Sequence, residues 1–418
     1  MVSLLWTHAA WAFCGGWVSY DAETIPNSAS QVVLARSATE VVLTLGADAL
    51  APPQDFAMLL PVPEALDAAD VAVVEPARLD ALDAWTAPRG LALTCDDLFG
   101  GDSADTGADT GVAAGDTVAV EAQFVVGGWE ITVVQAGGAE GLLAWLHAEG
   151  LVAPVAMEAV LDEYIASGQH FVVAQVHLDS LAEGATWPDP LQVRYPLSGP
   201  SVVLPVRLGA AVSAGTQEVV VWVLGAEGDG RYAVSNATEA PLEVGCLRPE
   251  GTTLADFYAL HLDRTFEAGL WITEFAGPAD PEVPCSICAG PVPDADALAA
   301  LGSATGFPYV TRLRLRYAPE AVTQDLVLYP TGLVTPLVAH YLDPAEELAG
   351  VVPTCGEGVI GGGDCGQVED TGDEPPLRWG DPPVPEAVEP PAAEGCWEGL
   401  AGVGVVVGLG VAARRRRR

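Results

Sequence analysis

The stretch Thr311-Arg-Leu-Arg-Leu-Arg-Tyr317 decides the fold. Polar and apolar side chains alternate along it, and successive side chains of a β-strand point to opposite faces of a sheet. The three arginines (Arg312, Arg314 and Arg316) therefore share one face, and the leucines and the tyrosine share the other. In so acidic a chain we expect the arginines to meet carboxylates on adjacent strands. A binding site for a polyanion or a carboxylate ligand is the alternative. Residues 325–329 are expected to pair with this strand.

Outward from this strand, valine-rich alternation and apolar runs between turn residues predict further strands. They cover residues 30–45 as two strands, 55–63, 117–135, 170–178, 191–195, 201–207, 217–224 and 231–235. Helical spacing of apolar residues predicts helices at 75–86, 138–147, 154–166, 251–262 and 294–301. Strands and helices do not alternate regularly. The pattern therefore predicts a β-rich α+β fold of mostly antiparallel sheets with a few short helices.

Charge and composition exclude several functions. The chain has 418 residues with 17 basic and 57 acidic side chains, a net charge of −40, and all the basic residues are arginine. Such a surface repels nucleic acid, so we expect no nucleic-acid partner. Because the chain has no lysine, a P-loop, a Schiff base and the kinase and β-lactamase motifs are excluded.

The N-terminus carries a candidate export signal. Ala10-Trp11-Ala12 has the small-x-small form of a signal-peptidase site, so we expect residues 1–12 to be a signal peptide cleaved between Ala12 and Phe13. The segment is short for such a signal and has no basic residue. This favours a start codon upstream of Met1 over the alternative that the segment is no signal.

Three consecutive features near the C-terminus indicate an anchoring tail at residues 396–418. Residues 351–395 are rich in proline, glycine and acidic residues, which predicts a disordered linker that serves as a stalk. Cys396 follows, and then an apolar run from Leu400 to Ala413 that predicts a short helix. That run is shorter than the roughly 20 residues of a helix that spans a bilayer. The last residues hold this end in the cytoplasm by the positive-inside rule; they are Arg414, Arg415, Arg416, Arg417 and Arg418.

This order of cysteine, short apolar helix and arginine cluster resembles the MYXO-CTERM sorting tail of myxobacteria and their relatives. The resemblance implies recognition in the membrane by sorting and processing machinery, with Cys396 as the point of processing and attachment. An ordinary single-pass tail anchor is the alternative. Both interpretations put the body, residues 13–350, outside the cytoplasm. A division of the body into two subdomains near the acidic loop 100–116 remains open.

The remaining cysteines are expected to form disulfides, because export leads to an oxidising compartment. They are Cys14, Cys95, Cys246, Cys285, Cys288, Cys355 and Cys365. Their spacing favours pairs of Cys355 with Cys365, of Cys14 with Cys95, and of Cys246 with Cys285 or Cys288. The CxxC formed by Cys285 and Cys288 lies among turn residues, which favours a disulfide over the alternatives of a redox or zinc site.

No motif identifies a catalytic, cofactor-binding or metal-binding residue. Asp-Thr-Gly recurs in acidic low-complexity sequence, whereas an aspartic protease needs it on a buried turn. His170 and His177 fall on opposite faces of one strand, so they do not share a metal ion. The loop 96–116 lacks calcium-loop spacing, so we expect it to be solvated, with calcium binding as the alternative. Its candidate ligands are Asp96, Asp97, Asp102, Asp105, Asp109 and Asp116.

Several short stretches fit, in the same order, the pattern of one bacterial family. They are Cys14-Gly15-Gly16-Trp17, Asp55-Phe56-Ala57 with Leu60-Pro61-Val62-Pro63, Thr86-Ala87-Pro88, Ala144-Trp145-Leu146, Tyr164-Ile165-Ala166-Ser167-Gly168 with Phe171-Val172-Val173-Ala174, Leu204-Pro205-Val206-Arg207-Leu208 and Thr311-Arg312-Leu313. On these stretches, residues 14–330 resemble the secreted family called domain of unknown function 2330. The resemblance implies an exported protein, often myxobacterial, with no assigned activity.

Together these features predict an exported protein of the cell envelope or cell surface, associated with the membrane by its tail. A structural or binding role is favoured over enzymatic activity, and no cofactor is identified. A secreted hydrolase with a carboxylate site that no motif reveals, and a calcium-dependent adhesion protein, are the alternatives.

Overall fold

The computed structural model describes residues 16–19, 27–49, 56–92, 120–176, 181, 188–213, 215–283, 291–344, 348 and 352–356. These residues form four sheets and the helices that pack against them.

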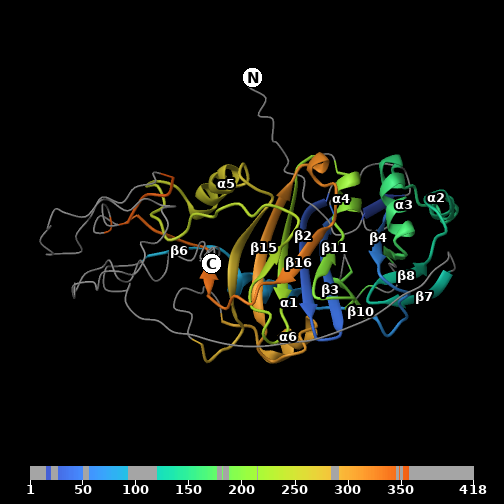
Figure 1. Ribbon diagram of the computed structural model, residues 1–418, viewed down its shortest axis with the longest axis horizontal. Coiled ribbons are helices and arrows are strands. Elements are labelled where there is room, and N and C mark those ends of the chain that lie inside the picture. The colour runs from blue at the N-terminus through green and yellow to red at the C-terminus, as the bar shows by residue number, and fades with distance from the viewer. Residues whose placement is uncertain are drawn as a thin grey trace, which may run out of the picture.

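A central sheet of eight strands forms the middle of the body (Figure 1). In order across the sheet, its strands are β17 (Leu337–Val338), β14 (Trp271–Pro278), β15 (Tyr309–Tyr317), β12 (Gln217–Leu224), β2 (Asn27–Arg36), β3 (Glu40–Ala49), β10 (Leu191–Pro196) and β5 (Val71–Val73). Neighbours are antiparallel except β12 and β2, which run parallel. β12 is buried along its whole length, as its run of consecutive apolar residues requires when both faces of a sheet are covered.

A second sheet has five antiparallel strands. In order, these are β1 (Gly16–Ser19), β4 (Phe56–Val62), β9 (His170–Val176), β8 (Trp129–Val134) and β7 (Val120–Val126). Gly127 and Gly128 join β7 to β8 with φ of 50° and 89°. A type I′ hairpin turn has positive φ at both of its central positions, which glycine adopts without strain. Pro61 is tolerated in β4 because the pairing of β4 with β1 has already ended at Leu59.

Two smaller sheets complete the strands. β11 (Val202–Leu204), β16 (Leu326–Pro330) and β13 (Tyr232–Val234) form an antiparallel sheet with β16 in the middle. β18 (His340–Leu342) and β6 (Arg89–Leu91) pair in parallel. The prediction that residues 325–329 pair with the strand at 311–317 is therefore wrong: β16 leaves the plane of the central sheet and pairs with β11 and β13.

Helices cover the outer faces of the sheets. They are α1 (Pro76–Thr86), α2 (Ala139–Ala148), η3 (Val155–Met157), α3 (Glu158–Ala166), α4 (Arg207–Ala211), α5 (Leu254–Thr265), α6 (Ala295–Ala300) and η5 (Pro319–Ala321). The side chain of Thr253 accepts a hydrogen bond from the backbone N–H of Asp256, and this cap fixes the start of α5. In the same way Asp294 caps α6.

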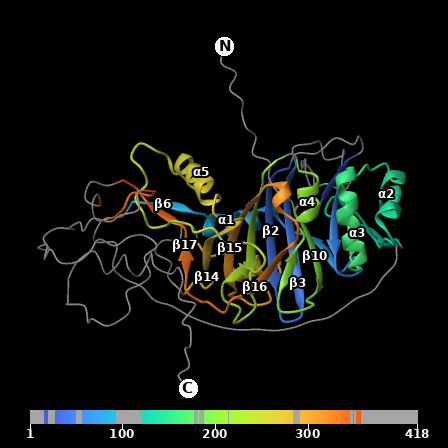
Figure 2. The same cartoon turned by 45° about the horizontal axis from the view of Figure 1, so that its top comes forward.

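The layers follow from the apolar faces of these elements. The largest core lies between the central sheet and the five-stranded sheet, with the three-stranded sheet packed on the same side. α2 and α3 cover the other face of the five-stranded sheet, and α1 and α6 cover the other face of the central sheet. α5 and β6 lie at the end of the molecule opposite to α2 and α3 (Figure 2). The predicted β-rich α+β fold is confirmed.

Two predicted boundaries change. Both large sheets take strands from either side of residues 100–116, so a subdomain division there, which the sequence leaves open, would not separate the two sheets. The predicted linker 351–395 begins too early. Val352 and Cys355 are buried against the body, because Thr354 pairs with Leu247. The rest of the predicted linker and the tail lie outside the described residues.

Candidate functional site

The arginine row of β15 is the most polar feature of the buried interior. β15 alternates as predicted: Leu313 and Leu315 face the core between the sheets, and the three arginines face the helix-covered side. β14 and β12 flank β15 and supply the carboxylates of Glu274 and Glu218. The expectation that the arginines meet carboxylates on adjacent strands is confirmed.

Glu274 lies on this face, next to a β-bulge in β14. Thr273 pairs with Leu313 and Phe275 pairs with Arg312, so Glu274 is the extra residue between them. Ile272 pairs with Arg314, so alternation along β14 already directs Glu274 to the arginine face, and the bulge places Phe275 on the same face. The side chain of Glu274 is fully buried.

Acids and arginines then alternate in a continuous row, which we call the ion-pair ladder. Its order is Asp263, Arg316, Glu218, Arg314, Glu274, Arg312 and Asp83, from the end of α5 to α1. Arg312 Nε donates to Glu274 Oε2 at 2.6 Å, and Arg314 donates to both Glu274 and Glu218. The two terminal acids are partly exposed, whereas Glu274 and Glu218 are buried.

Aromatic side chains enclose the ladder. Arg312 lies over the ring of Trp222 at 5.0 Å, and Arg316 lies over Phe266 at 5.1 Å. The hydroxyl of Tyr258 donates to Glu274 Oε1 at 2.5 Å. Exclusion of water strengthens the attraction within these ion pairs. The paired charges, the aromatic rings and the Tyr258 hydroxyl together offset the cost of removing the charges from water.

The ladder remains charged over a wide pH range. Burial alone would raise the pKa of Glu274, but the charges of Arg314 and Arg312 lower it to about 2. Burial would lower the pKa of Arg314, and the neighbouring Glu274, Tyr258 and Glu218 raise it above its ordinary value. An ionised Glu274 only accepts hydrogen bonds, so it does not act as a general acid near neutral pH. The ladder is a cross-link between α1, the central sheet and α5.

Arg89 lies beside the ladder without a carboxylate among the described residues. Its Nη2 donates to the carbonyl oxygens of Trp85 and Ala87 at the end of α1. Its buried Nε and Nη1 have no hydrogen-bond partner in the part of the chain that the structure describes. Burial and the charge of Arg312 lower the pKa of Arg89 to about 10.

A second polar cluster lies at the end of the five-stranded sheet. Nδ1 of the buried His170 lies 2.8 Å from Glu121 Oε2, and its Nε2 lies 3.4 Å from the side-chain nitrogen of Gln135. Because a carboxylate accepts, the short contact fits a proton on Nδ1 that points at Glu121. Burial and the charge of Asp70 raise the pKa of Glu64, and His170 opposes this rise.

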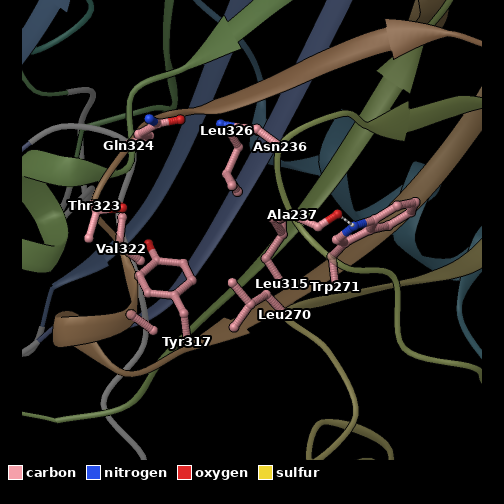
Figure 3. A pocket seen from close by; sticks show the side chains of 11 residues that line it. Asn236, Ala237, Leu270, Trp271, Leu315, Tyr317, Val322, Thr323, Gln324 and Leu326 are labelled. Atoms are coloured by element: carbon pink, nitrogen blue, oxygen red, sulfur yellow. Dashed lines mark hydrogen bonds between the residues drawn. The ribbon is translucent and has the colours of Figure 1, made fainter.

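A small hollow lies between β14, β15 and the loop before β16 (Figure 3). Trp271 and Tyr317 line it together with Gln324 and Leu326, and Trp271 Nε1 donates to the carbonyl of Ala237 at 3.2 Å. Its volume of about 60 Å³ is far below the roughly 300–1,000 Å³ of sites for small molecules. It has room for water or one small group.

One disulfide is described, and it corrects the predicted pairing. Cys246 is bonded to Cys355, with their Cα atoms 5.0 Å apart. The expected pairs of Cys355 with Cys365, and of Cys246 with Cys285 or Cys288, are therefore wrong. A sequence separation of 109 residues hid the true partner, because spacing favours neighbours in the chain.

Most of the other predicted site residues lie outside the described residues. These are Ala12, Phe13, Cys14, Cys95, Cys285, Cys288, Cys365, Cys396, the five terminal arginines, His177 and the acidic loop 96–116. Among the residues that are described, no group of three or more His, Cys, Asp or Glu side chains is arranged to hold a metal ion. No helix within the described ranges is long and apolar enough to cross a membrane.

The described residues form a β-rich body whose interior contains the ion-pair ladder. Residues 8–329 match the model of a family described as an uncharacterized protein conserved in bacteria (DUF2330). The chain belongs to this family, as the ordered stretches from Cys14 to Leu313 suggested. No curated protein and no solved structure matches the chain.

Proposed function

We propose that the chain is an exported cell-envelope protein with a structural or binding role, displayed at the surface through its C-terminal tail. The observation that carries this proposal is the order of Cys396, the apolar run 400–413 and the terminal arginines behind an acidic, proline-rich stalk. The disulfide between Cys246 and Cys355 supports it, because disulfides persist mainly in oxidising compartments.

The ion-pair ladder supports the structural or binding role rather than catalysis. Its arginines already pair with carboxylates, and its central acid Glu274 is fully buried. Such an interior holds α1 and α5 rigidly on the sheet. A rigid body on a self-repelling stalk fits a surface module whose partner is a macromolecule outside the membrane.

Cell fractionation with mass spectrometry of the mature protein tests the proposal. We expect the protein in the envelope fraction, cleaved after Ala12 and lacking residues 414–418, with Cys396 modified or at the new end. Cys396→Ala should accumulate with its arginines intact, whereas Trp397→Phe should be processed like the natural chain. Recovery of an unmodified, full-length C-terminus from the cytosol would refute the proposal.

A secreted hydrolase is the second candidate. The observation that favours it is the cluster of His170, Glu121 and Glu64, in which one carboxyl has a raised pKa near a histidine. Hydrolysis of esters, glycosides and peptides by the purified full chain should then fall at least tenfold in Glu64→Gln, while Glu140→Gln on the exposed side of α2 should retain it. Absence of any hydrolysis by the natural chain removes this candidate.

A further inference from the structure

The last described segment of the body, Val352–Gly356, stands directly before the chain that leads to the tail. Leu247 makes parallel bridges to Leu342 on one side and to Thr354 on the other. β6, β18, residues 246–248 and residues 353–355 therefore lie side by side. Among the described residues, 353–355 is the outermost of these four.

Few backbone hydrogen bonds hold this outermost segment. Leu247 N–H donates to the carbonyl of Pro353 at 2.8 Å, and Cys355 N–H donates to the carbonyl of Leu247 at 2.9 Å. The N–H of Gly356 adds a hydrogen bond to Glu243 Oε2 at 2.9 Å. A peripheral strand with so few bonds opens locally far more easily than a sheet centre.

The disulfide between Cys246 and Cys355 opposes this local opening. Cys246 and Cys355 are both buried, in a cluster with the rings of Phe257 and Tyr341. Tyr341 belongs to β18, and Phe257 belongs to α5. The same helix carries Tyr258, which donates to Glu274 of the ion-pair ladder, and Asp263, the terminal acid of the ladder. The covalent bond thus ties the exit of the chain to the cross-linked interior.

We infer that the Cys246–Cys355 disulfide is a mechanical clasp, which carries tension on the C-terminal chain into the body and prevents residues 352–355 from peeling away. The inference rests on the proposed function, because tension arises when the tail is anchored. Without the clasp, a pull on residue 357 loads three hydrogen bonds one after another. With it, the same pull breaks at most the hydrogen bond of Gly356 before it loads a covalent bond that ends at Cys246.

Hydrogen exchange of the purified full chain tests the clasp without any membrane, so its outcome is separate from that of the fractionation experiment. In the Cys246→Ala, Cys355→Ala double variant, peptides that cover 352–356 should exchange at least tenfold faster than in the natural chain. Peptides from β15 should be unchanged. Val352→Ala removes a buried side chain nearby but keeps the bond, and its 352–356 peptides should stay close to natural protection.

Equal exchange of 352–356 in the natural chain and the double variant would overturn the inference, and so would an equal rise across β15. Single-molecule stretching between the C-terminus and a handle at Ser198 gives a second readout. The double variant should show an early extension step that the natural chain lacks. The same step in the natural chain would equally overturn the inference.

Discussion

The carboxylate of Glu274 accepts a hydrogen bond from Arg312 Nε at 2.6 Å, and both side chains are buried. Glu274 joins this pair to the rest of the ion-pair ladder, because it also accepts from Arg314 on its other side. Ile272 pairs with Arg314, so alternation along β14 directs Glu274 to the arginine face of β15. Because Glu274 binds both Arg312 and Arg314, the ladder is sensitive to substitution at this one residue.

Replacement of Glu274 should destabilise the body strongly. Glu274→Gln leaves Arg312 and Arg314 without their shared countercharge, and breaking a buried ion pair from one side costs about 3–5 kcal/mol. Asp263→Asn at the exposed end of the ladder is the matched control and should cost less than about 1 kcal/mol. Denaturant unfolding measures both, and similar losses for the two variants would contradict the role of Glu274.

Acid should weaken the body through the same residue. The folded-state pKa of Glu274, about 2, lies below its ordinary value of 4.5. Its contribution to stability is therefore complete above pH 4.5 and disappears as the pH falls towards 2. Glu243, Glu64 and Asp325 act in the opposite sense, because their pKa values are raised mainly by burial.

Comparison of the natural chain with Glu274→Gln separates the contribution of Glu274 to acid sensitivity from that of the other carboxyl groups. Between pH 5 and pH 3, the natural chain should lose more unfolding free energy than Glu274→Gln. The reason is that only the natural chain has a carboxylate at position 274, which takes up a proton in the unfolded state over this pH range. Denaturant unfolding at both pH values measures this. Parallel losses in the two proteins would show that Glu274 is not the acid-sensitive group.

Arg89 and Arg312 should differ although both are buried arginines. Arg312→Met leaves Glu274 and Asp83 with one partner fewer and should cost about 3–5 kcal/mol. Arg89→Met removes a buried charge that has no carboxylate partner among the described residues, and it forfeits two hydrogen bonds to carbonyls. Its cost should be about 1–2 kcal/mol. Thermal or denaturant unfolding of the two variants measures the loss of unfolding free energy. A larger loss in Arg89→Met than in Arg312→Met would contradict this prediction.

Calcium should have no effect on the melting temperature. The acids of loop 96–116 lack the spacing of known calcium loops, so we expect water rather than calcium around them. A binding ion would stabilise the folded state by mass action. The melting temperature is measured in the presence of calcium and in the presence of a chelator. A rise in melting temperature with calcium that the chelator reverses would instead support calcium-dependent adhesion.

Parts of this architecture follow directly from the sequence, and others depend on long-range partners. Strict alternation from Thr311 to Tyr317 predicts both the faces of β15 and the meeting of its arginines with carboxylates. Glu274 was missed because residues 271–278 were not predicted as a strand, and alternation along β15 does not reveal which strand lies beside it. The pairing of Cys246 with Cys355 was missed for a related reason, since it depends on how distant segments come together.

The pairing of β16 shows the same limit. Residues 325–329 follow β15 closely in the chain, and such neighbours often form a hairpin. Here η5 intervenes and β16 crosses to β11 and β13. Apolar periodicity identifies the strand but contains no information about its partner.

The parallel contact of β2 with β12 also determines when the body can fold during synthesis. β2 belongs to the first hairpin, yet its neighbour on one side emerges only with Val219–Leu224, and β15 follows later still. Such distant pairings make folding slow, because the chain entropy of long loops is lost before contacts compensate. We expect the nascent chain to stay open until β15 has been made, in a form that can be threaded through a narrow translocation channel.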